Sequence, residues 1–119
     1  MRRAAVLLAL AACGGPLDHK KLRGEVQDLH SIAAEARMLF ERGAPRAFFD
    51  VHREMLADNV KKAGDKLLKG VDDDALEPSR QEAEVLARAL EPIVRTAEDP
   101  EMIKPFEMML FELDQRLKE

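Results

Sequence analysis

Few side chains in this sequence have both a type and a position suited to chemistry, and His52 is the first of them. A projection at about 100° per residue puts His52 near the middle of an otherwise apolar helix face, and Asn59 lies two turns further along that face. A metal site would require His30 to meet His52 across a helix pair, with Met55 or Glu25 as a further ligand. This interpretation predicts a periplasmic metal- or small-ligand-binding bundle centred on His52.

The spacing gives that interpretation little support. Neither His30 nor His52 has a glutamate three residues earlier, so the Glu-x-x-His motif of di-iron bundles is absent. Periplasmic four-helix cytochromes share the architecture, but the chain has neither Cys-x-x-Cys-His nor a histidine in its last helix. The alternative is that His52 and Asn59 form hydrogen bonds to neighbouring groups and fix the helix register. We expect this structural role and no bound cofactor.

The sequence contains few residues suited to catalysis. The hydroxyl groups are limited to Ser31, Ser79 and Thr96, and tyrosine and tryptophan are absent. Ser31 follows His30 directly, so on a helix the two side chains point about 100° apart and cannot act as a nucleophile and its base. No glycine-rich phosphate-binding loop is present. We expect the protein not to be an enzyme.

Cys13 is the only cysteine, and it closes a segment typical of exported proteins. Arg2 and Arg3 precede an apolar run over residues 4–12 that ends in small residues, as in a signal peptide. The run is too short to cross a bilayer, which takes about 20 apolar residues. One possibility is an ordinary secretory signal that is cut after Ala11, which would leave the Cys13 thiol free.

The four residues from Leu10 to Cys13, Leu-Ala-Ala-Cys, resemble the lipobox of bacterial lipoproteins. The resemblance implies that residues 1–12 are a signal peptide cut before Cys13, whose sulfur carries a diacylglycerol, and that the new amino terminus is acylated. Several acyl chains give stable membrane anchoring, whereas one chain holds only marginally. Because Gly14 follows the cysteine in place of Asp, the resemblance implies a periplasm-facing outer-membrane location in a Gram-negative cell. In other bacteria it implies the outer face of the plasma membrane.

The remaining chain is acidic. Loss of Arg2 and Arg3 lowers the number of basic residues from 19 to 17 against 23 acidic ones, which leaves a formal net charge of -6. This charge disfavours nucleic acid and anionic lipid head groups as partners. Membrane attachment is therefore expected from the lipid on Cys13, with residues 13–17 as a short tether.

Residues 18–119 show the periodicity of four amphipathic helices joined by short breaks. The first helix is predicted over 18–41, with Asp18 as its N-cap, and the second over about 45–70. The third begins with Asp74 and Glu77 as a capping box, or with Glu77 as the cap. Asp99 precedes the fourth helix, whose first turn, residues 101–104, is predicted to be irregular.

The apolar faces of these segments predict a single core. The residues expected to be buried are Leu22, Val26, Leu29, Ile32, Ala33, Ala36, Leu39, Phe40, Phe48, Met55, Leu56, Val60, Ala63, Leu67, Leu76, Ala83, Leu86, Ala87, Leu90, Ile93, Val94, Ala97, Met102, Phe106, Met109, Leu110, Leu113 and Leu117. Pro92 is expected to kink the third helix without dividing it. The predicted fold is all-α, an up-down antiparallel four-helix bundle.

A few apolar side chains lie away from the predicted core faces. They are Val85, Met108 and Phe111, together with Met38. If Val85, Met108 and Phe111 lie side by side, they form a patch suited to a protein partner or to a second copy of the chain. We therefore expect a membrane-anchored cell-envelope lipoprotein that acts as a small helical interaction or scaffold module.

Overall fold

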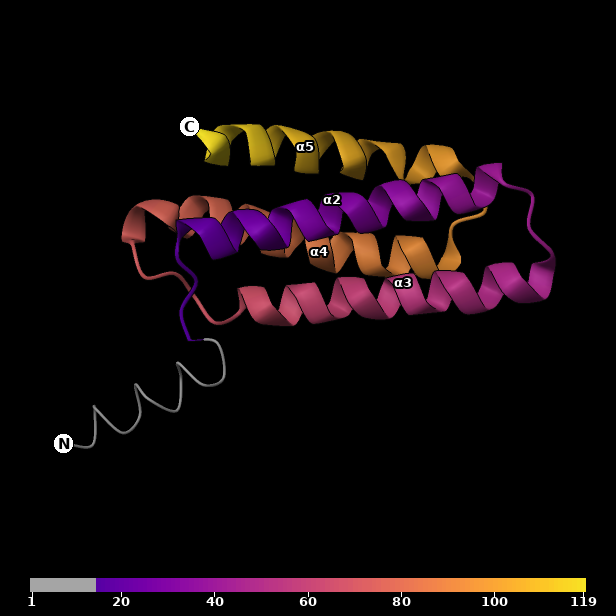
Figure 1. Ribbon diagram of the computed structural model, residues 1–119, viewed down its shortest axis with the longest axis horizontal. Coiled ribbons are helices and arrows are strands. Elements are labelled where there is room, and N and C mark those ends of the chain that lie inside the picture. Colours follow the sequence, from indigo (N-terminus) through magenta and orange to yellow (C-terminus); the bar gives the residue numbers. More distant parts are fainter. Residues whose placement is uncertain (1–14) are drawn as a thin grey trace.

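The computed structural model describes residues 15–119, which form an up-down antiparallel bundle of four α-helices (Figure 1). The helices are α2 (His19–Glu41), α3 (Arg46–Leu67), α4 (Glu77–Thr96) and α5 (Lys104–Lys118), with 3-10 turns η1 (Asp74–Leu76) and η2 (Pro100–Met102). This arrangement confirms the predicted all-α bundle. The predicted signal peptide, the lipobox and Cys13 lie outside the described residues.

The two ends of α2 follow the predicted signals. Asp18 caps the helix, because its carboxylate accepts a hydrogen bond of 2.7 Å from the Lys21 amide. After the helix, Gly43 adopts a φ of +64°, a left-handed conformation that turns the chain at little cost only in glycine. Helix α3 begins at Arg46, directly after Pro45, so the short connection makes α2 and α3 antiparallel.

The connection between α3 and α4 differs from the prediction. Helix α3 ends at Leu67, ahead of the predicted Gly70, because Leu68 already bonds back to Asp65 in a tighter 3-10 turn. The capping residue is Asp73, which accepts from the Ala75 amide at 3.0 Å and starts η1. The predicted capping box of Asp74 and Glu77 is therefore wrong, and α4 begins at Glu77 without a side-chain cap.

The second half of the chain follows the predicted breaks, whereas the kink expected at Pro92 stays a prediction. Helix α4 continues through Pro92 as one helix, and the Thr96 hydroxyl donates to the Pro92 carbonyl at 2.7 Å. Asp99 starts η2 by accepting from the Glu101 amide at 2.9 Å. The regular helix α5 begins only at Lys104, which confirms an irregular first turn.

The core is apolar, and no polar or charged residue within residues 15–119 is fully buried. Helix α3 packs most extensively on α4, and α2 packs most extensively on α5. A Cβ built on Gly64 of α3 would lie 3.5 Å from the Ala87 Cβ of α4, so these two backbones approach closely. The most deeply buried large side chains are Leu22, Val26, Leu29, Leu39, Leu56, Val60, Leu67, Leu90, Val94, Ile103, Leu110 and Leu113.

Four residues predicted for the core are exposed. Because α3 turns its buried stripe toward α4, Phe49 packs against the core while Phe48 and Met55 are 55% and 50% exposed. In the η2 region, Ile103 is fully buried in place of Met102. Met109 is also exposed. A projection from the sequence places a stripe only to within one position around the helix, and this uncertainty produced the errors.

Candidate functional site

The residues predicted to form a metal site lie on two helices, His30 on α2 and both His52 and Met55 on α3. The His30 ring faces α5, with its centroid 6.0 Å from that of Phe111. The His52 ring lies on α3, where it contacts Phe48 edge to face at 5.5 Å. Helices α5 and α3 flank α2 on opposite sides (Figure 1). Met55 is half exposed to solvent, so the structure does not gather the three predicted ligands.

A metal site centred on His52 therefore stays a prediction, and the structure does not bring its predicted ligands together. Within residues 15–119, no group of three or more His, Cys, Asp or Glu side chains is placed to hold a metal ion. The His52 Nδ1 atom is buried and has no hydrogen-bond partner among the same residues. Asn59 lies at the cleft between α2 and α3, where it lines the wall on α3.

The three residues of the predicted partner patch are all exposed, but they lie on two helices and in different surroundings. Val85 of α4 is 65% exposed, and Met108 and Phe111 of α5 are 64% and 51% exposed. Phe111 leans toward α2, because its ring contacts His30. Phe111 thus has an α2 neighbour that the sequence pattern did not indicate, and the grouping of the three residues into one patch stays a prediction.

A second exposed apolar surface lies on α3, and we call Phe48, Val51 and Met55 the α3 stripe. These residues are spaced i, i+3 and i+7, so they share one helix face. Val51 is 72% exposed, the most among the large apolar side chains of residues 15–119. The sequence pattern predicts Phe48 and Met55 as core residues, so it does not reveal the stripe. Val51 is the residue from which the stripe could have been predicted. It is apolar, is not among the predicted core residues, and is adjacent on the helix surface to Phe48 and Met55.

The first turns of α3 are held in place by Arg53, which reaches over to the end of α4. Its Nε donates to the Val94 carbonyl at 3.0 Å, and its Nη2 donates to the Ala97 carbonyl. Its guanidinium also lies over the rings of Phe40 and Phe49, at 5.5 and 4.9 Å from their centroids. Partial burial lowers the pKa of Arg53, but an arginine stays charged at neutral pH. These contacts tie the part of α3 that carries the stripe to the end of α4.

The opposite end of the bundle receives the chain from the predicted tether. Leu17 is buried, its amide donates to the Gly70 carbonyl at 2.8 Å, and its carbonyl accepts from the Asp72 amide at 3.0 Å. This short parallel bridge between Leu17 and Val71 ties the N-terminal segment to the α3–α4 connection. The last tether residue is therefore part of the folded domain. Both segments lie at one end of the bundle (Figure 1).

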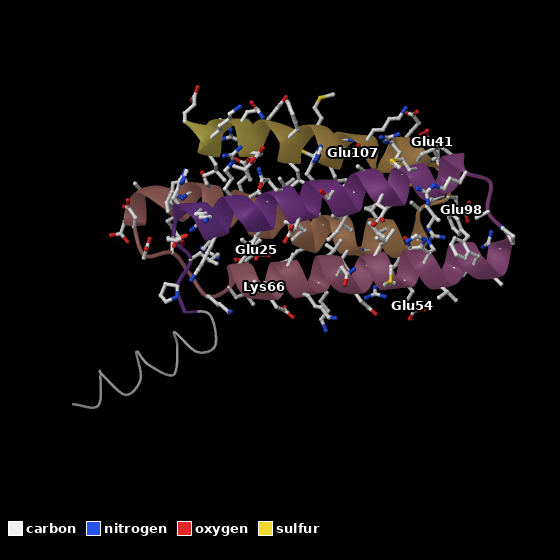
Figure 2. The ribbon with its side chains drawn as sticks, viewed as in Figure 1. Glu25, Glu41, Glu54, Lys66, Glu98 and Glu107 are labelled. Carbon is white, nitrogen blue, oxygen red and sulfur yellow. The ribbon has the colours of Figure 1, made fainter. Side chains whose placement is uncertain are left out.

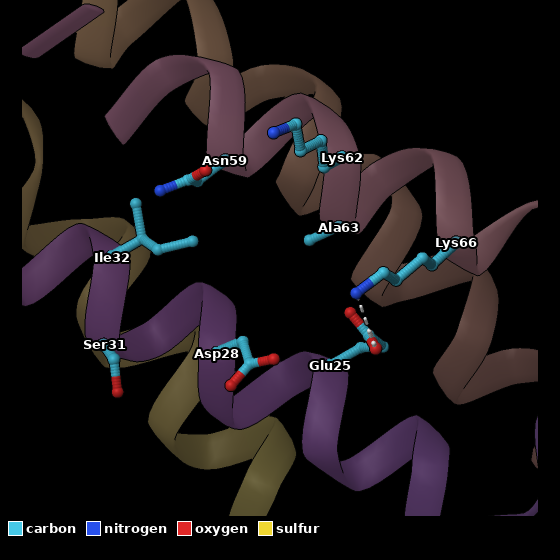
Figure 3. Close-up of a pocket in the computed structure, with 8 residues that line it drawn as sticks. All are labelled: Glu25, Asp28, Ser31, Ile32, Asn59, Lys62, Ala63 and Lys66. Atoms are coloured by element: carbon cyan, nitrogen blue, oxygen red, sulfur yellow. Dashed lines mark ion pairs between the residues drawn. The ribbon is translucent and has the colours of Figure 1, made fainter. Parts of the chain in front are cut away.

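A polar cleft opens between α2 and α3 (Figure 3). It has a volume of about 320 Å³. Glu25 and Asp28 line the α2 wall, and Asn59, Lys62 and Lys66 line the α3 wall. In Figure 2, Glu25 and Lys66 lie on the neighbouring flanks of these two helices, whereas Glu54 lies on the outer side of α3.

Glu25 is the most constrained ionisable group of this cleft. Its side chain is 15% exposed, and its Oε2 lies 3.9 Å from the Lys66 Nζ, too far for a hydrogen bond. Its Oε1 is buried without a hydrogen-bond partner among residues 15–119. Burial raises the pKa of Glu25, the charge of Asp28 raises it further, and Lys66 opposes the shift.

No protein-family model, curated protein or solved structure matches this chain. None of the helices within residues 15–119 has the combination of length and apolar character needed to cross a bilayer.

Proposed function

We propose that this protein is a lipid-anchored helical module of the bacterial cell envelope that binds a protein partner through the α3 stripe. The observation that carries the proposal is that Leu17 and the α3 stripe lie toward opposite ends of the bundle. Leu17 docks at one end, and the stripe lies on the half of α3 nearest the other end. The proposal includes no catalytic step.

The short tether supports this arrangement. Four residue steps separate Cys13 from Leu17, and each step covers at most about 3.6 Å, so the docked end lies within roughly 15 Å of the lipid-bearing cysteine. Val51 lies 16 residues before the end of α3, which corresponds to about 24 Å along the helix axis. A bundle held at its Leu17 end can therefore present the α3 stripe away from the bilayer.

The stripe has the chemistry of a protein-binding helix face. Phe48, Val51 and Met55 supply adjacent apolar contacts, and Asp50 and Glu54 lie between them in the sequence with exposed side chains. Apolar centres with a polar rim are characteristic of protein interfaces. The favoured partner is therefore a protein with an apolar groove and basic residues at its edge, or a second copy of the chain that meets the same face.

Photo-crosslinking in intact cells tests the proposal. We would place p-benzoylphenylalanine at Phe48 in the full chain and, as a matched control, at Phe111, since these two rings are 55% and 51% exposed. We expect a discrete crosslinked species in the membrane fraction from Phe48. A crosslink from Phe111 alone would instead assign the interface to Val85, Met108 and Phe111.

A pair of exposed valines supplies the second control. The change Val51→Lys should abolish the Phe48 crosslink, because it places a charge in the centre of the stripe. The matched change Val85→Lys, at a similarly exposed position on α4, should leave the crosslink intact. If both changes or neither change removes the crosslink, the α3 stripe is not the binding surface.

A further inference from the structure

The cleft between α2 and α3 is not used by the proposed function, and its walls carry opposite charges. Glu25 and Asp28 stand on α2, whereas Asn59, Lys62 and Lys66 stand on α3, with Lys66 opposite Glu25 (Figure 3). The volume of about 320 Å³ lies at the lower end of the range for small-molecule sites. The cleft can therefore hold a small molecule but not a folded partner.

The acidic wall of the cleft carries two carboxylates. Glu25 is 15% exposed, and Lys66 approaches its Oε2 only to 3.9 Å, which is too long for a hydrogen bond. The other oxygen, Oε1, is buried without a hydrogen-bond partner among residues 15–119, so it is out of reach of a ligand in the cleft. The Asp28 carboxylate adds a second negative charge to the same wall. A ligand ammonium group suits this wall, because it supplies several N–H donors and a positive charge.

The opposite wall offers donors. Asn59 is half-buried and Lys62 is exposed, and neither side chain forms a hydrogen bond or an ion pair within the described part of the chain. An amide N–H and an ammonium group together suit a carboxylate. Between the two walls, Ile32 and Ala63 provide an apolar surface for a side chain.

We propose that this cleft binds a small zwitterion of the α-amino acid class. The ligand ammonium group meets Glu25 and Asp28, and the ligand carboxylate meets Asn59 and Lys62. A simple cation is disfavoured by the two lysines, and a simple anion is disfavoured by the two carboxylates. Only a molecule with both charges matches both walls.

Leucine and two singly charged analogues test this site. The full chain, labelled with ¹⁵N and held in mild detergent, would be titrated with leucine, N-acetylleucine and leucinamide. We expect saturable shifts of backbone amides over residues 25–32 and 59–66 with leucine. Each analogue lacks one charged group, so each should bind about tenfold more weakly or not at all.

Variants assign the contacts to each wall. Glu25→Gln and Lys62→Met should each weaken leucine binding by about tenfold, since each removes one charge from the cleft. The controls are Glu54→Gln, on the outer side of α3, and Lys61→Met, next to Lys62 but outside the cleft, and both should leave binding unchanged.

Three results would overturn the proposal. They are the absence of saturable shifts with leucine, shifts confined to another part of the bundle, and equal binding of all three compounds. Because the titration needs neither a partner nor a lipid, its failure would leave the proposed interaction module untouched. A loss of the Phe48 crosslink would likewise not affect the cleft.

Discussion

At the scale of single residues, Glu25 connects burial to pH dependence. Its pKa in the folded protein is raised from an ordinary value of 4.5, so the protonated form stabilises the fold. This stabilisation is complete below the ordinary value and is lost as the pH rises through the folded pKa. We therefore expect Glu25→Gln to be more stable than the parent at pH 7, with the difference shrinking toward pH 4, in urea unfolding at each pH.

Glu77 provides the control of opposite sign. Hydrogen bonds from Arg80 lower the pKa of Glu77, so its ionised form stabilises the fold above the ordinary value, and this stabilisation is lost as the pH falls through the folded pKa. Glu77→Gln should therefore be less stable than the parent at pH 7, and the difference should vanish in acid. The same sign for both variants at pH 7 would contradict the assigned causes.

Arg53 should contribute more to stability than a typical surface arginine. Arg53→Met keeps the apolar stem but leaves the carbonyls of Val94 and Ala97 without the guanidinium donor. We expect a loss of about 2 kcal/mol in the free energy of unfolding. Arg46→Met is the matched control, because Arg46 is 84% exposed and its single ion pair, with Asp50 at 3.4 Å, lies at the surface. This change should lower the free energy of unfolding by less than about 0.5 kcal/mol. Equal losses would show that the contacts of Arg53 are not stabilising.

At the scale of the elements, glycines separate helix interiors from turns. A Cβ at Gly64 would make only ordinary contact with Ala87, so Gly64→Ala should stabilise α3 by about 0.5 to 1 kcal/mol through its better helix propensity. Gly70 has a φ of +79°, which is strained for alanine, so Gly70→Ala should destabilise the protein by about 1 kcal/mol. Thermal unfolding checks both signs, and a destabilised Gly64→Ala would mean that α3 and α4 pack more tightly than described.

Sequence periodicity predicted the helices well because their signals are local. The cap at Asp18, the left-handed turn at Gly43 and the buried positions of α4 each depend on a few neighbouring residues. Which face of α3 is buried depends instead on how closely α4 approaches α3 at Gly64, and this approach is a property of the tertiary structure. This is why the α3 stripe was missed.

The cleft could not be predicted from the sequence for a related reason. Its walls come from residues on two helices, and their pairing depends on the register between those helices. The sequence suggests Glu25 only as a possible metal ligand, and nothing in the spacing connects Glu25 with Lys66. The predicted structural role of Asn59 and His52 is not observed: Asn59 lines the cleft, and neither side chain forms a register-fixing hydrogen bond within residues 15–119.

At the scale of the whole molecule, Leu17 couples the predicted anchor to the fold. Leu17→Ala should lower the free energy of unfolding by about 2 to 3 kcal/mol, because it empties a buried site and weakens the link to the α3–α4 connection. Leu68→Ala, close to the same connection but 53% exposed, should cost less than about 0.5 kcal/mol. Similar effects in urea unfolding would show that residue 17 is not part of the cooperative fold.

If Cys13 carries a lipid as proposed, this coupling determines which end of the bundle lies near the bilayer. The bridge between Leu17 and Val71 leaves only residues 14–16 between Cys13 and the folded domain. A lipid on Cys13 would then hold one end of the bundle near the membrane and leave the first half of α3 accessible to a partner. Without that lipid, the opposite placement of Leu17 and the α3 stripe would have no functional meaning.

The most direct test is therefore the intact mass of the protein extracted from cell membranes. The account predicts a chain that begins at Cys13 and carries a diacylglycerol, with further acylation of the new amino terminus, and it predicts that Cys13→Ser remains uncleaved. A chain that begins after Ala11 with a free thiol, or an uncleaved chain with unmodified Cys13, would contradict the membrane anchor.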